Sequence, residues 1–260
     1  MRRHPGRGGR RVAASGAAAG LVLLAACGDG RPLASEPVPS PEVEPGVLVC
    51  QGVEVPREVL TGGRSGEDLG EEGQAALAGE EVPPVDDLAS WTVAEESGAR
   101  LTLLRELPEP EDLGAGDVRT HEVLAVARPG GAEGEGWVLA SSATCALRVP
   151  LPGGLEPASL TRDPARPLDP GSDVVALLAT ELACASGQDA QGRVQVVDVV
   201  QGVQAVDVVL GVEPLEGGAD CPSNPPTPVQ VRLDAPLGDR EVRDAGTEPA
   251  RTLAPEPAGP

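Results

Sequence analysis

Cysteine is the residue type in this chain whose spacing points most directly to chemistry. The 260-residue sequence contains five cysteines, and none belongs to a Cys-x-x-Cys pair, so we expect no zinc ribbon and no other metal site. In an oxidising compartment the last four would form two disulfides, and four cysteines allow three pairings. We favour Cys50–Cys145 and Cys184–Cys221, one in each half of the chain, because domains usually close on themselves.

The first residues form an export signal. Residues 1–11 contain five arginines and no acid, and residues 12–26 contain no charge and end in a leucine-rich run. A basic start followed by a short apolar stretch is typical of a secretory signal. The stretch is too short to cross a hydrocarbon layer of about 30 Å comfortably as a permanent helix.

Leu24-Ala25-Ala26-Cys27 follows this stretch and resembles the lipobox of bacterial lipoproteins. The resemblance implies that the signal is cut before Cys27 and that the Cys27 sulfur carries a diacylglycerol. The membrane is then a partner, and the protein is lipid-anchored on the extracytoplasmic face of the cell membrane. Two acyl chains anchor a protein stably, whereas one does so only marginally. The alternative is ordinary secretory cleavage beside an incidental cysteine.

Composition excludes one large class of partner. The chain has 20 basic and 41 acidic residues, a net charge of -21, and a pI near 4.4. Signal cleavage would remove five basic residues and no acidic one. Because nucleic acids are bound through Lys and Arg, we expect no nucleic-acid partner. The sequence also shows no cofactor motif, and we expect no cofactor.

The core must be built from valine, leucine and alanine, because the chain has two tryptophans and no other aromatic residue. Valine clusters favour β-sheet. We therefore expect a β-rich α+β fold: a small α+β segment followed by an antiparallel β module, with a disordered N-terminal tether and C-terminal tail. The predicted boundaries are 1–26 for the lipoprotein signal peptide, 27–46 for a Pro/Glu-rich tether, 47–149 for the α+β segment, 150–172 for a Pro/Gly-rich linker, 173–246 for the disulfide-closed β module and 247–260 for a flexible tail.

Hydrophobic periodicity predicts the elements of both segments. Ser65 followed by Asp68 predicts a helix start, with Leu69, Ala76 and Leu77 on one face, although three glycines weaken this helix. The predicted strands are 90–94, 100–107, 121–128 and 137–147 in the first segment, and 174–184, 193–200, 204–212, 227–234 and a short edge strand at 240–242 in the second.

Three stretches of the C-terminal third, at residues 183–187, 221–229 and 236–240, resemble a group of uncharacterised actinobacterial secreted proteins and lipoproteins. The resemblance covers residues 174–246 well and the N-terminal part only loosely. It supports the boundaries of the second segment and a bridge between Cys184 and Cys221. It implies no activity.

Candidate catalytic groups are few. His121 is the one histidine after the signal, and the chain has no Gly-x-Ser-x-Gly elbow, so we predict no catalytic residue and interpret His121 as a surface or edge-strand residue. Trp91 and Trp137 each begin a predicted strand and are interpreted as core anchors. The acidic runs at 67–72 and 109–117 lack the EF-hand pattern and are interpreted as solvated loops rather than calcium sites.

The densest motif is the proline-rich loop at residues 221–228. One interpretation makes it a rigid turn that leads into the strand at 227–234. The other makes it a recognition loop, with Asn224 beside Asp239 and Arg240. The rigid turn is favoured because prolines stiffen an aromatic-poor fold.

These features predict a cell-envelope lipoprotein rather than an enzyme. It would be a non-catalytic binding or structural module displayed at the membrane surface, with an unknown envelope protein or ligand as its partner. One alternative is the solute-binding lipoprotein of a transporter, which would need two α/β lobes around a cleft. The other is an envelope hydrolase, which would need a nucleophile activated by His121.

Overall fold

The computed structural model describes residues 46–253, and all of them fall in one compact unit. The predicted signal peptide, Cys27, the tether up to residue 45 and the tail beyond residue 253 lie outside the described residues. The described fold is β-rich α+β with antiparallel sheets, as predicted.

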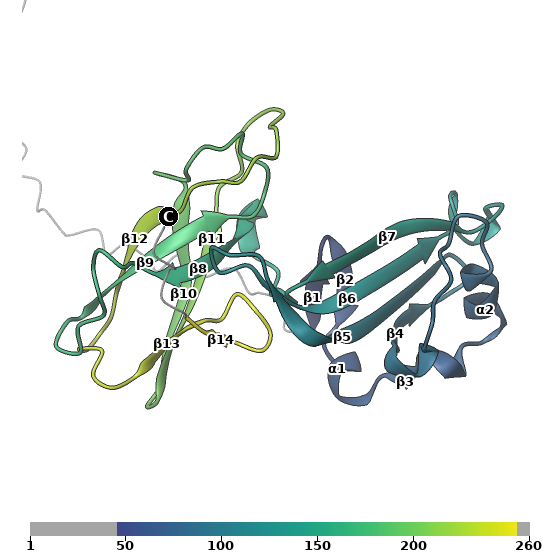
Figure 1. The fold of residues 1–260 in the computed structure, drawn as a ribbon, viewed down its shortest axis with the longest axis horizontal. Coiled ribbons are helices and arrows are strands. Elements are labelled where there is room, and N and C mark those ends of the chain that lie inside the picture. The colour runs from purple at the N-terminus through teal and green to yellow at the C-terminus, as the bar shows by residue number, and fades with distance from the viewer. Residues whose placement is uncertain (1–45, 254–260) are drawn as a thin grey trace, which may run out of the picture. The chain divides into compact units, whose positions relative to one another are not determined.

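The first segment is a five-stranded antiparallel sheet in which neighbours along the chain are neighbours in the sheet (Figure 1). Its strands are β3 (Arg64–Ser65), β4 (Thr92–Glu96), β5 (Arg100–Asp112), β6 (Val118–Ala127) and β7 (Val138–Cys145). The last four overlap the four predicted strands, although β5 extends past its predicted end at residue 107. Two further strands, β1 (Val47–Cys50) and β2 (Val53–Pro56), form a separate antiparallel hairpin that was not predicted.

Both faces of this sheet are buried, because apolar residues occupy successive positions of its central strands. Leu101 and Leu103 of β5 belong to one hydrophobic cluster, whereas Leu104 belongs to the other. The first cluster is covered by the helix α2 (Glu71–Leu77) and by both tryptophans. The second is covered by the β1–β2 hairpin. Trp91 and Trp137 are core anchors, as interpreted.

The predicted helix begins later than Ser65. Ser65 caps a short 3-10 turn, its Oγ accepting a hydrogen bond from the Glu67 amide, and α2 starts only at Glu71. The helix has a glycine at position 73, although glycine is a weak helix former, because there is no room for a side chain there. A Cβ atom there would lie 2.4 Å from Oε1 of Glu96, and the Gly73 amide donates to that same oxygen at 2.9 Å. Of the three residues predicted to share a helix face, Ala76 is buried and Leu77 is partly buried, whereas Leu69 is buried but precedes α2.

The remaining helical pieces are short. They are the helix α1 (Val59–Gly62) and the 3-10 turns Gly66–Asp68, Leu88–Ser90, Gly131–Glu133 and Pro152–Gly154.

The second segment is a seven-stranded sheet of order β12-β9-β8-β11-β13-β14, with β10 on the other edge of β11. The strands are β8 (Glu156–Arg162), β9 (Val174–Glu181), β10 (Val194–Gln201), β11 (Ala205–Val212), β12 (Thr227–Arg232), β13 (Glu241–Asp244) and β14 (Arg251–Thr252). One hydrophobic cluster collects the alternate residues of β8, β9, β11, β12 and β13. Pairing is antiparallel except between β11 and β13, which are parallel.

Two predicted boundaries are wrong. The predicted linker at 150–172 contains β8, which pairs with both β9 and β11 and is largely buried. The predicted tail contains β14 and the buried Leu253, so the folded part extends past residue 246. The predicted edge strand at 240–242 is also not at an edge, because β13 pairs with β11 on one side and β14 on the other. The strand β8 was not predicted because the residues on both sides of it are rich in proline. The strand itself has a single proline, near its start.

Candidate functional site

The two expected disulfides are present. Cys50 is bonded to Cys145, which joins β1 to β7, and Cys184 is bonded to Cys221, which joins the end of β9 to the loop before β12. Disulfides form and persist outside the reducing cytoplasm. The protein is therefore extracytoplasmic. Among residues 46–253, no helix is long and apolar enough to cross a membrane.

The residues of the predicted recognition loop do not come together. Asn224 donates from Nδ2 to the carbonyl oxygens of Glu181 and Ala183, at 2.9 and 2.7 Å. Arg240 instead donates to carbonyls of its own loop, and Asp239 and Arg240 line a separate cavity. The strand β12 lies between the two sites and keeps them apart.

Strand pairing gives the physical reason. Thr227, at the start of β12, pairs with Ala179, and Arg232, at its end, pairs with Val174. The loop before β12 and the loop after it therefore lie at opposite ends of β9. The hydrogen bonds of Asn224 match the favoured interpretation of a rigid turn.

His121 lies on β6, half-buried and opposite Glu106 of β5. Because β6 is an interior strand that pairs with both β5 and β7, the interpretation of His121 as a surface or edge-strand residue is wrong. The Nδ1 of His121 is 2.8 Å from the hydroxyl oxygen of Thr120, the residue before it. Burial lowers the pKa of His121, and the carboxylate of Glu106 opposes that shift only in part.

The acidic runs show no cation site. Asp112, at the end of β5, accepts a hydrogen bond from the Gly114 amide, which is an ordinary loop contact. Within the part of the chain that the structure describes, no cluster of three or more Asp, Glu, His or Cys side chains is arranged to hold a metal ion.

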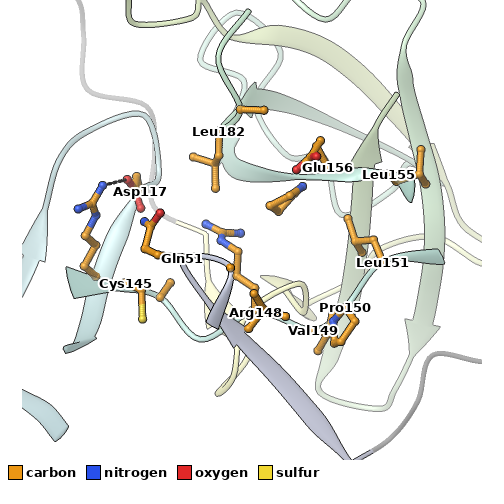
Figure 2. A pocket seen from close by; sticks show the side chains of 16 residues that line it. Gln51, Asp117, Cys145, Arg148, Val149, Pro150, Leu151, Leu155, Glu156 and Leu182 are labelled. Atoms are coloured by element: carbon orange, nitrogen blue, oxygen red, sulfur yellow. Dashed lines mark hydrogen bonds and ion pairs between the residues drawn. The ribbon is translucent and has the colours of Figure 1, made fainter. Parts of the chain in front are cut away.

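A cavity of about 540 Å³ lies at residues 145–157, the turn between β1 and β2, and Leu182 (Figure 2). We call it the Arg148 cavity, because the guanidinium of Arg148 points into it. Its volume lies within the range of about 300–1,000 Å³ that is usual for small-molecule sites. A smaller cavity beside Asn224 shares Asp117, Leu182 and Ala183 with it.

Backbone pairing holds Arg148 in place. Residue 148 forms isolated antiparallel bridges with Val49 of β1 and with Thr247, so both ends of the described chain fix its backbone. The side chain is only 8% exposed, and its Nη1 donates to the carbonyl oxygen of Ala158 at 3.1 Å. Burial lowers the pKa of Arg148, while Asp244 and Asp117 favour the charged form. An arginine nevertheless stays charged at any ordinary pH.

Asp244 is the buried carboxylate behind Arg148. Burial raises its pKa, and the charges of Arg148 and Arg251 act in the opposite direction. Its Oδ1 accepts a hydrogen bond from the Gly246 amide, and its Oδ2 lies 3.6 Å from Nη2 of Arg251. Arg251 also donates to the carbonyls of Gly116 and Leu160. Arg251 thus hydrogen-bonds to both segments and forms the ion pair with Asp244.

Two of the charged residues that line the cavity neutralise each other. Arg119 and Asp117 form an ion pair at 3.3 Å. Arg148 and Glu156 take part in none of the ion pairs that the described residues form. Within residues 46–253, the cavity therefore presents one cation and one anion without a direct ion-pair partner, although Asp244 and Asp117 favour the charged form of the cation.

No family model, curated protein or solved structure matches this chain. Its role must therefore be argued from its own residues.

Sequence reasoning missed the Arg148 cavity. It singled out none of Arg148, Glu156 and Leu182, and it assigned residues 150–157 to a linker. One signal was present: Arg148 stands alone in the apolar run Ala146-Leu147-Arg148-Val149, and an isolated charge in a buried stretch needs a partner or a function. The position of the cavity, however, depends on pairing between segments that are about a hundred residues apart in the sequence.

Proposed function

We propose that the protein is a lipid-anchored protein of the cell envelope that binds a ligand or partner at the membrane surface without catalysis. The observation that carries the proposal is the pair of disulfides, which places residues 46–253 outside the cytoplasm. The basic start, the apolar stretch and the Leu24-Ala25-Ala26-Cys27 motif supply the means of export and anchoring.

The anchor is needed to keep such a chain at a membrane. With 41 acidic and 20 basic residues, the protein is repelled by anionic headgroups. A diacylglycerol on Cys27 provides two acyl chains, which suffice for stable attachment.

Binding without catalysis is the activity that the site supports best. The Arg148 cavity has charged groups and apolar walls, but no histidine or cysteine thiol among the residues that line it. His121 contacts the hydroxyl of Thr120 on its own strand, and the chain has no Gly-x-Ser-x-Gly elbow to present a nucleophile.

Intact-mass analysis of protein extracted from membranes tests the anchor. We expect a polypeptide that begins at Cys27 and carries the mass of a diacylglycerol. Cys27→Ala should release the protein to the medium or leave it uncleaved, whereas Ser35→Ala, outside the motif, should leave it in the membrane. A different first residue, or a mass without fatty chains, would refute lipid anchoring.

Labelling with an activity-based fluorophosphonate probe tests the absence of catalysis. We expect no labelling of the purified protein. Labelling that disappears in His121→Ala would instead establish a hydrolase. Crosslinking in native membranes, followed by mass spectrometry of the captured species, then identifies the partner.

A further inference from the structure

The Arg148 cavity contains a buried cation with unused hydrogen-bonding capacity. A guanidinium carries five N–H donors. Among the described residues, the one hydrogen-bond acceptor for the Arg148 guanidinium is the carbonyl oxygen of Ala158. Figure 2 shows the rest of the guanidinium facing the open space of the cavity. A group that accepts hydrogen bonds from two adjacent guanidinium nitrogens, such as a carboxylate, fits this position.

Glu156 supplies the opposite charge. It stands at the first position of β8, its carboxylate turns towards the cavity, and it forms no ion pair with the described residues. A ligand that carried only an anion would contact Arg148 but face repulsion from Glu156. A ligand with both an anionic and a cationic group satisfies both side chains.

The walls between and beside these charges are apolar. Leu151 and Leu155 line one side, and Leu182 lines another. Leu182 is 36% exposed, which places it among the exposed large hydrophobic side chains of the protein. Covering these leucines with hydrocarbon would remove apolar surface from water, at about 25 cal/mol per Å².

The net charge of the protein also favours a neutral ligand. A chain with a formal charge of -21 repels anions at a distance, so a free carboxylate approaches it slowly. A zwitterion has no net charge and avoids this penalty. It still presents a carboxylate once it enters the cavity.

We propose that the Arg148 cavity binds a small zwitterion with an apolar body, of which the apolar amino acids are the simplest members. The carboxylate contacts the guanidinium of Arg148, the ammonium contacts the carboxylate of Glu156, and the hydrocarbon packs against Leu151, Leu155 and Leu182. The inference rests on the proposed binding function and names the ligand class for it.

Calorimetric titration of the purified protein with L-leucine and two analogues tests the assignment. The analogue 4-methylpentanoate lacks the ammonium, and 3-methylbutylamine lacks the carboxylate. We expect L-leucine to bind and each analogue to bind at least about tenfold more weakly, because a charge-assisted hydrogen bond contributes about 1.5–3 kcal/mol. Equal affinities for L-leucine and both analogues would overturn the zwitterion assignment.

Charge variants separate the two ends of the ligand. Glu156→Gln should reduce the affinity for L-leucine to that for 4-methylpentanoate, and should leave the affinity for 4-methylpentanoate unchanged or raise it. Glu133→Gln, at an exposed turn of the first sheet, is the matched control and should change neither. Arg148→Lys keeps the charge but loses the planar fork, and should weaken L-leucine and 4-methylpentanoate alike.

The failure of this inference is distinguishable from failure of the proposed function. If leucine, isoleucine, valine and methionine all fail to bind, the zwitterion site is refuted, whereas a lipid on Cys27 and a crosslinked partner would still support the envelope role. An L-leucine affinity that is unaffected by Glu156→Gln would show that the ligand binds elsewhere.

Discussion

Both sheets must form a core with few or no aromatic residues, but they arrange and cover their apolar residues differently. The first, β3 to β7, is buried on both faces, and its apolar residues fall into two clusters covered by short pieces of chain: α2 on one face and the β1–β2 hairpin on the other. The second sheet collects its apolar residues in one larger cluster. Each cover of the first sheet is too small to be stable alone, since an isolated hairpin is marginal in water.

The two disulfides are placed differently relative to these cores. Cys50–Cys145 ties the β1 cover to the sheet beneath it, whereas Cys184–Cys221 ties together two loops at the end of an already closed core. A disulfide should stabilise the fold most where the segment that covers a core buries little area of its own.

Removing the first disulfide should destabilise the protein more than removing the second. The bonded cysteines are 95 residues apart for Cys50–Cys145 and 37 apart for Cys184–Cys221. In the chain-entropy relation these separations correspond to about 4.7 and about 3.8 kcal/mol of unfolding free energy. Denaturant unfolding of the two double alanine variants measures both losses. A larger loss for the second pair would contradict our account of the hairpin cover.

Replacing one buried leucine in each sheet by alanine should affect tryptophan fluorescence and circular dichroism differently. Leu103→Ala in the first sheet and Leu177→Ala in the second both remove a fully buried side chain, and each should cost about 2–5 kcal/mol. Both tryptophans belong to the first sheet's clusters, so fluorescence reports on that sheet while circular dichroism reports on both. Leu103→Ala should shift the fluorescence midpoint more. Equal fluorescence shifts would show that the two sheets unfold as one unit.

Arg251 should be a contact that partly couples the unfolding of the two sheets. Its Nη2 donates to Gly116 in the first segment, at 3.1 Å, and to Leu160 of β8, at 3.0 Å. Arg251→Ala should cost about 1.5–3 kcal/mol, as expected for hydrogen bonds from a charged group. The fluorescence and circular-dichroism transitions should then lie further apart than in the wild type. Arg251→Lys, which retains the charge near Asp244, should keep them closer, and coincident transitions in Arg251→Ala would rule out this coupling.

The smallest effect concerns pH and the first sheet alone. Burial lowers the pKa of His121 below its ordinary value of about 6.5, so the folded protein favours the neutral ring. The stability contributed by His121 is therefore complete above that value and is lost as the pH falls through the lowered pKa. Unfolding measured at pH 7.5 and pH 5 should show a smaller decrease in stability for His121→Asn than for the wild type. An identical decrease would indicate that His121 titrates normally.

The sequence predicted most strands but not the site. Strands such as β12 alternate cleanly, with Thr227 and Val231 buried and Pro228, Gln230 and Arg232 exposed, and period-two patterns of this kind are local. The β1–β2 hairpin was also local but was missed, although its two-residue turn, Gln51-Gly52, has positive φ at both positions and glycine at the second. The Arg148 cavity could not be predicted, because its members meet only through long-range pairing.

One consequence concerns mechanical load. The Gly46 carbonyl accepts a hydrogen bond from the Arg57 amide, and β1 begins at the next residue. If Cys27 carries a lipid, a force that pulls the protein away from the membrane acts first on the start of β1. The hydrogen bonds of β1 could then break one after another. Cys50 ends that strand and passes the force through a covalent bond into β7. The disulfide would then confine such peeling to the four residues of β1, because the force passes from Cys50 to β7 before it reaches β2.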